Sequence, residues 1–100
     1  MPPRDPRAES FRAGFELDSA YRELRRADLM LQQMEAHNPD AQETALAREV
    51  FELASRLYRE AFNARQREEN SKAAEYAVAV KDLMRAMDKF YNVLFCGASC

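Results

Sequence analysis

The sequence predicts an all-α protein, an antiparallel three-helix bundle of long amphipathic helices that self-association completes. Three observations support this class. Apolar residues recur at spacings of three and four along most of the chain, which is the period of a helix face. The 100 residues include only two glycines and four prolines, so few positions interrupt a helix. The chain is 47% apolar and 32% charged, which is typical of one globular domain and not of a disordered segment.

The first helix is expected at about residues 9–36, after a flexible N-terminal segment at 1–8. Phe11 and Phe15 are four residues apart. One apolar stripe then continues at spacings of three and four, and it consists of Leu17, Tyr21, Leu24, Ala27, Leu31 and Met34. Pro39 ends this helix, because a proline disfavours the helical conformation of the residue before it.

The second helix is expected at about residues 41–68. Asp40 and Glu43 have the spacing of an N-cap residue and its partner in the first turn, which places the start of this helix at about Ala41. One apolar stripe runs along the helix at spacings of three and four. It consists of Leu46, Val50, Leu53, Leu57, Ala61 and Ala64.

The boundary before the third helix depends on pattern alone, because no glycine or proline lies there. The stretch 65–72 is polar on all sides, and the stripes before and after it differ in phase by about a third of a turn. These features favour a reversal near Asn70 and Ser71, a third helix at about 72–96 and a tail at 97–100. One continuous helix is the alternative. The third stripe comprises Tyr76, Val80, Leu83, Met87, Phe90 and Leu94, of which Leu83 and Met87 are expected in the core.

The second and third helices carry more apolar surface than one core-facing stripe needs. Each has a further apolar line at helical spacing, which predicts burial on a second side. A large exposed apolar patch usually marks a protein interface, so we expect contact with a second copy or another protein. The alternative is a monomer with wide stripes and a few exposed aromatic side chains. The candidate interface residues are Phe51, Tyr58, Phe62, Met84, Tyr91 and Phe95.

The composition argues against several classes of function. Fifteen basic and seventeen acidic residues are interspersed, unlike the basic face of a nucleic-acid-binding domain. The apolar runs are far shorter than the ~20 residues that span a bilayer, so no membrane contact is expected. The single histidine, His37, lacks the accompanying ligands of a zinc site. We expect no metal, no cofactor and no catalytic residue, since phosphate-binding and nucleophile motifs do not occur either.

Both cysteines, Cys96 and Cys100, lie near the C-terminus. Two terminal thiols do not make a disulfide framework, and the N-terminal residues have no apolar segment typical of a secretory signal. We therefore expect a cytoplasmic protein in which Cys96 is a small buried apolar residue. A disulfide between the two cysteines is the alternative.

These observations predict one domain over residues 1–100 that acts as a non-enzymatic protein-interaction module. We expect a homodimer whose interface comes from the aromatic residues of the second and third helices. One alternative is an adaptor or chaperone-like subunit that binds a different protein. The other is a small all-α enzyme with an arginine-rich anion site, for which the candidate residues are Arg22, Arg25, Arg26, Arg56 and Arg59.

Overall fold

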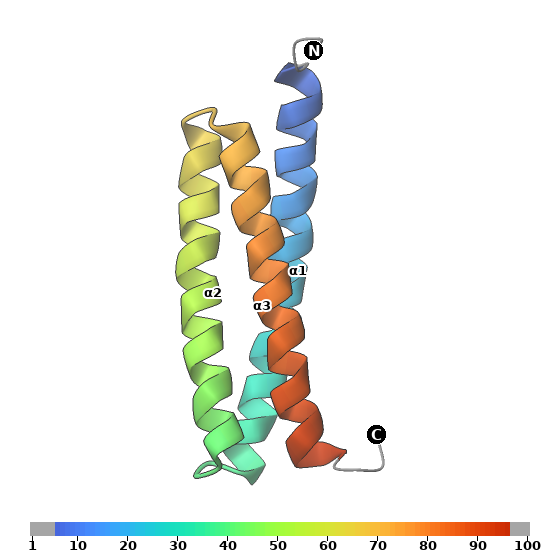
Figure 1. The fold of residues 1–100 in the computed structure, drawn as a ribbon, viewed down its shortest axis with the longest axis vertical. Coiled ribbons are helices and arrows are strands. Elements are labelled where there is room, and N and C mark those ends of the chain that lie inside the picture. Colours follow the sequence, from blue (N-terminus) through green and yellow to red (C-terminus); the bar gives the residue numbers. More distant parts are fainter. Residues whose placement is uncertain (1–5, 97–100) are drawn as a thin grey trace.

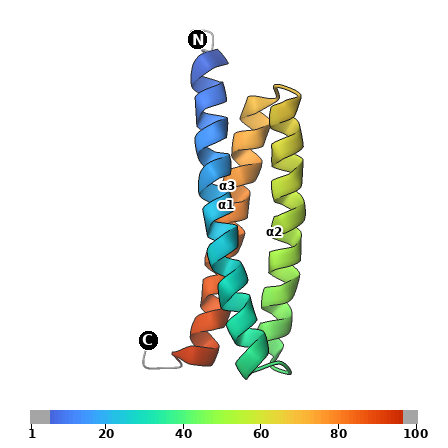
Figure 2. The same ribbon diagram turned by 180° about the vertical axis from the view of Figure 1, so that it is seen from behind.

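The computed structural model describes residues 6–96, which form three helices joined by two short turns (Figures 1 and 2). Helix α1 is Pro6–His37, α2 is Gln42–Gln66 and α3 is Asn70–Phe95. The described residues contain no strand. Each helix runs antiparallel to the one before it, so the predicted antiparallel three-helix bundle is confirmed.

Helix α1 begins at Pro6, about three residues before the expected start. Proline suits the first turn of a helix, because the N–H that it lacks would have no partner within the helix there. The last residues of the segment 1–8, which we expected to be flexible, are therefore helical. Residues 1–5 and the predicted tail 97–100 lie outside the described part of the chain.

The turn between α1 and α2 contains Pro39, as the sequence predicts. The N-cap of α2 is Ala41 and no side chain caps it, so the predicted cap at Asp40 is wrong. Thr44 holds this turn instead. Its buried hydroxyl donates a hydrogen bond of 2.7 Å to the carbonyl oxygen of Asn38, which links the first turn of α2 to the end of α1.

The chain reverses between α2 and α3, so the predicted hairpin is confirmed and the continuous helix is excluded. The turn lies at residues 67–69, just before the predicted position at Asn70 and Ser71. The N-cap of α3 is Glu69, and no side chain caps this helix either.

The backbone of this turn explains why the sequence marks it weakly. Glu68 has a φ of 62°, in the left-handed region. The amide of Glu68 donates to the carbonyl oxygen of Arg65, and the amide of Glu69 donates to that of Ala64, each at 2.9 Å. This pair of hydrogen bonds is a Schellman motif, which usually has glycine at the left-handed position. Here glutamate occupies that position, so the usual sequence signal is missing.

Alanine lines most of the core. Ten of the 16 buried apolar residues are alanines, and in α1 and α2 they recur every seven residues, the repeat of coiled-coil-like packing. Small side chains let helices approach closely. We call these positions the alanine seam, and they are Ala13, Ala20 and Ala27 in α1 and Ala47, Ala54 and Ala61 in α2.

Larger side chains flank the seam and are mostly half-buried. Successive residues of a helix are rotated by about 100°, so Leu57 lies on one side of the α2 alanines and Tyr58 on the other. Both side chains pack against the same core, which means that the two apolar lines of α2 flank a single core. In α3, Met87 is fully buried, as predicted. Leu83 is only half-buried and packs against the edge of the core.

Three ion pairs join α1 to α3. Arg12 Nη2 lies 3.0 Å from Glu75 Oε1 near the turn between α2 and α3. Lys81 Nζ lies 2.7 Å from Glu16 Oε2, and the two side chains are only 20% and 15% exposed. Arg26 donates to both carboxylate oxygens of Asp88 at 3.1 Å. These contacts hold α3 against α1.

We expect Ala54→Leu to lower the free energy of unfolding by about 1–3 kcal/mol, because the seam has no room for a larger side chain. Ala45→Leu is the matched control, since Ala45 is exposed on the same helix and the change there should be under ~0.5 kcal/mol. Urea unfolding followed by circular dichroism measures both. Equal effects would contradict close packing at the seam.

We expect Glu68→Gly to raise the free energy of unfolding by about 0.5–1 kcal/mol, since glycine adopts a positive φ without a Cβ clash. Glu68→Ala removes the same carboxylate but keeps the Cβ atom, so it should not stabilise the protein. Thermal unfolding distinguishes the two variants, because 1 kcal/mol shifts Tm by about 4–8 °C in a domain of this size. A lower Tm for Glu68→Gly would contradict strain at this turn.

Candidate interaction surface

The six residues predicted to form one interface lie in three different places. Met84 is fully buried in the core, so its assignment to an interface is wrong. Tyr91 and Phe95 pack against the C-terminal end of α1. The remaining aromatic residues of the set, on α2, lie on its α1 side; they are Phe51, Tyr58 and Phe62. The fold therefore does not assemble the predicted aromatic interface within one copy of the chain.

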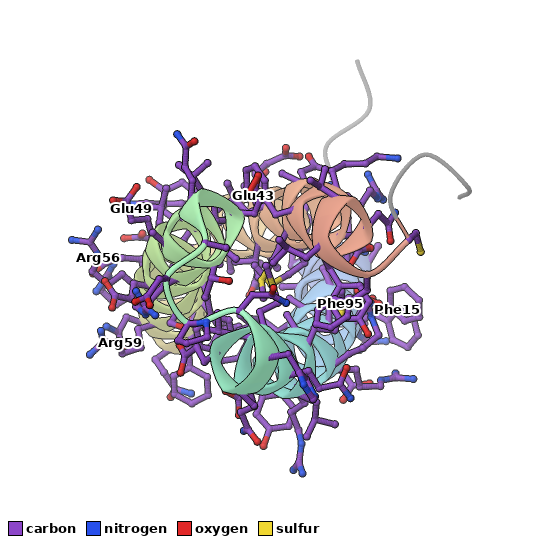
Figure 3. All side chains as sticks on the ribbon, turned by 90° about the horizontal axis from the view of Figure 1, so that it is seen from below. Phe15, Glu43, Glu49, Arg56, Arg59 and Phe95 are labelled. Carbon is purple, nitrogen blue, oxygen red and sulfur yellow. The ribbon has the colours of Figure 1, made fainter. Side chains whose placement is uncertain are left out.

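Tyr91 and Phe95 are used within the bundle. The Tyr91 hydroxyl donates a 2.8 Å hydrogen bond to Oε1 of Gln33 in α1. The rings of Tyr91 and Phe95 are 4.5 Å apart between centroids, and the Phe95 ring meets the ring of His37 edge-on at 6.1 Å. Figure 3 views the bundle from this end and shows Phe95 on the α1 side of α3. These two side chains therefore contact α1 within one copy, although Phe95 stays 39% exposed.

We expect Tyr91→Ser to lower the free energy of unfolding by about 1–3 kcal/mol, because its ring packs on α1. Tyr91→Phe keeps the ring and loses only the exposed hydrogen bond to Gln33, so it should cost under ~1 kcal/mol. Urea unfolding measures both changes. If Tyr91→Ser changed the mass in solution but not the stability, Tyr91 would belong to an interface after all.

A groove of about 410 Å³ lies between α1 and α2. Tyr21 and Tyr58 line it with ring centroids 6.1 Å apart, and the guanidinium of Arg25 lies 6.0 Å from the Tyr21 centroid. Burial, followed by the nearby Tyr21 and Asp18, raises the pKa of Tyr58 above its ordinary value. Helical spacing predicts that Tyr21 belongs to the apolar stripe of α1, but its side chain is 47% exposed beside this groove.

The five arginines proposed for an anion site do not all come together. Arg22 pairs with Asp18 on the same helix. Arg26 hydrogen-bonds to Glu23 at 2.8 Å and to Asp88, and these bonds raise its pKa against the opposing effect of burial. The other three lie nearer one another: Arg25 and Arg59 line the groove between α1 and α2, and Arg56 lies beside Arg59 on α2 (Figure 3). Across residues 6–96, no group of three or more metal-ligating side chains is placed to hold an ion.

A second apolar surface lies on the side of α2 and α3 that faces away from α1. Leu53 is 46% exposed and Val93 is 58% exposed. Counted from the turn, Leu53 and Leu83 are each 13 residues from the helix end, so they lie at the same height. We call this surface the outer face, and it consists of Leu46, Leu53 and Leu57 in α2 and Ala79, Leu83, Ala86, Phe90 and Val93 in α3.

Helical spacing predicts only part of the outer face. It assigns Leu53 to the apolar stripe of α2, but the alanine seam occupies the core and Leu53 lies at the surface. Ala86 and Val93 fell outside every stripe, although their seven-residue spacing places them on one side of α3. The seven-residue repeat of Ala79, Ala86 and Val93 is the feature of the sequence that predicts this line.

Helix α1 also exposes large apolar side chains: Phe11 and Phe15 lie one turn apart near its N-terminal end, and Leu29 lies far from them. Phe11 is 77% exposed, Phe15 58% and Leu29 62%, and Figure 3 shows Phe15 pointing away from the bundle. The three span 18 residues, or about 27 Å of helix, and the charged residues Asp18 and Arg22 lie between them. They form no continuous patch like the outer face.

Cys96 is disulfide-bonded, so the expectation that it is a small buried thiol is wrong. Cys100, the other cysteine of the sequence, lies outside the described residues. Within residues 6–96, no helix has both the length and the apolar content needed to cross a bilayer. Comparisons with protein-family models, curated proteins and solved structures found no match.

Proposed function

We propose that the protein is a non-enzymatic helical interaction module that forms a homodimer through the outer face of α2 and α3. The observation that carries this proposal is the exposure of Leu53 and Val93 within a surface of apolar residues on two neighbouring helices. Exposed apolar surface of this extent usually marks a binding site. Of the six residues first expected to form the interface, Met84 is buried and the others are divided between two separate places, so the proposed interface moves to this face.

The size of the outer face suits a stable dimer. Helices of 25 and 26 residues are about 38 Å long at 1.5 Å per residue, and two neighbouring helices are about 20 Å wide. The area of this two-helix face is therefore roughly 750 Å² for each copy. A standard protein interface buries about 800 Å² on each partner, which is close to this area. Two copies docked on this face would enclose the apolar residues in a four-helix core.

An adaptor that binds a different protein is the second candidate. The groove between α1 and α2 favours it, because Tyr21 and Tyr58 form an aromatic wall that could receive an apolar side chain. The small-enzyme alternative has less support, since two of the five arginines proposed for its anion site, Arg22 and Arg26, are paired with carboxylates. The cytoplasmic location stays a prediction from the sequence.

We expect the wild-type protein to be a dimer at micromolar concentration and Leu53→Gln/Val93→Gln to be a monomer with unchanged helicity. Both side chains are exposed in a single copy, so their replacement should leave the bundle folded. Leu29→Gln is the matched control, because Leu29 is exposed on α1 and its loss should leave the dimer intact.

Light scattering coupled to gel filtration, over a dilution series, gives the mass of each variant. A wild type that stays monomeric at all concentrations would contradict homodimerisation. A double variant that stays dimeric would place the interface on another surface.

A further inference from the structure

We infer that the groove between α1 and α2 binds a short acidic segment of another protein, which places one apolar side chain against Tyr21 and Tyr58. Carboxylates beside that apolar side chain pair with Arg25 and Arg59. This inference deepens the adaptor candidate and does not depend on the proposed homodimer. The supporting observation is that two arginines without carboxylate partners lie at an apolar groove, one on each helix.

The inside of the groove is mainly apolar and partly shielded from water. Leu24 of α1 lines it together with Phe51 and Tyr58 of α2, and all three side chains are half-buried. Ser55 also lines it, but its hydroxyl donates a 2.9 Å hydrogen bond to the carbonyl oxygen of Phe51. The groove therefore offers an incoming side chain mainly aromatic and aliphatic surface, which suits an apolar group.

Two guanidinium groups flank this apolar surface. Arg25 and Arg59 are exposed, and neither forms an ion pair with a carboxylate among residues 6–96. The Arg25 guanidinium lies 6.0 Å from the centroid of the Tyr21 ring. Figure 3 shows Arg59 on the α1 side of Arg56. Unpaired charges at a binding surface favour a partner of the opposite sign, so both arginines can receive carboxylates.

The acidic residues of α1 near the groove form no ion pair with these arginines. Asp28 lines the groove, but it accepts a hydrogen bond of 3.2 Å from Gln32. It is also seven residues from Tyr21, or about 10.5 Å along the helix. Asp18 pairs with Arg22 on its own helix. The part of the groove beside the tyrosines is therefore positive, while the end at Asp28 is negative.

This charge distribution suits a short acidic peptide better than a long polyanion. Glu52 lines a hollow that adjoins the groove, and Asp28 lies in the groove itself. A nucleic-acid strand along the groove would bring its phosphates close to these carboxylates, and like charges oppose association. A segment whose acidic residues lie only beside one apolar residue would meet the two arginines instead.

The groove and the outer face lie on different sides of α2. Ser55, in the groove, is two residues from Leu53 of the outer face, which is a rotation of about 200° around the helix. Docking of a second copy on the outer face would therefore leave the groove open. The two binding surfaces can be tested separately.

The peptide acetyl-Glu-Glu-Phe-Glu-Glu-amide tests the inference, with acetyl-Lys-Lys-Phe-Lys-Lys-amide as the peptide of opposite charge. We expect the acidic peptide to bind the full chain with a Kd about tenfold lower than that of the basic peptide at low salt. Its binding should shift the amide NMR signals of Leu24 and Ser55, which line the groove. Alanine in place of the peptide's phenylalanine should weaken binding, because the apolar anchor is lost.

Arg25→Glu/Arg59→Glu should reverse the preference, because carboxylates then stand where the guanidinium groups were. We expect the acidic peptide to lose about tenfold in affinity and the basic peptide to bind more tightly than the acidic one. Both arginines are exposed, so helicity measured by circular dichroism should not change. Arg67→Glu/Arg85→Glu is the matched control. It makes the same change in net charge at exposed positions outside the groove and should keep the wild-type preference.

The other outcomes would overturn the inference. It is wrong if neither peptide shifts the groove signals, if both peptides bind equally well, or if Arg25→Glu/Arg59→Glu keeps the wild-type preference. It is also wrong if a short single-stranded oligothymidine binds the groove more tightly than the acidic peptide, since nucleic acid would then be the occupant. The mass in solution decides the homodimer separately. A monomer that binds the acidic peptide supports this inference without the homodimer, and a dimer that does not bind it leaves only the homodimer.

Discussion

Close contact along the alanine seam is the constraint from which the rest of this structure follows. Residues such as Ala20 and Ala54 fill little space, so the helices meet through their backbones and short side chains. The large apolar residues that a wider bundle would place at its centre are displaced to the borders between helices. Leu53, on α2, is 46% exposed and becomes part of the surface. The same packing that makes a single copy compact thus creates the apolar outer face.

Helix α3 shows how one element can serve two neighbours. Its Met87 fills the core, while Lys81 and Asp88 reach α1 through ion pairs with Glu16 and Arg26. The Lys81–Glu16 pair is largely shielded from water, so its charges interact more strongly than the exposed pairs on the helix surfaces. Two apolar lines on this helix are therefore explained within one copy, and they do not by themselves require a partner.

Periodicity predicted the number, order and direction of the helices, because an amphipathic period depends only on which residues are apolar. It could not rank the apolar residues by burial. Hydrophobic patterning favours Leu53 over Ala54 as a core residue, whereas the structure buries the alanine. The turn was placed slightly too late for a related reason, since Glu68 occupies a position where glycine is the usual signal. The predicted interface failed at Met84 because a three-helix bundle buries two sides of a helix.

The turn at Glu68 also bears on the order in which the chain folds. It joins α2 to α3 through three residues and is closed by backbone hydrogen bonds, so these helices can pair with little loss of chain entropy. Contacts between α1 and α3, such as Arg12 with Glu75, close loops of about sixty residues and cost more entropy to form. We expect the hairpin to be the folding nucleus and α1 to dock last. Because α1 lies N-terminal to both, it would leave the ribosome first and wait as an unpaired amphipathic helix until its partners are made.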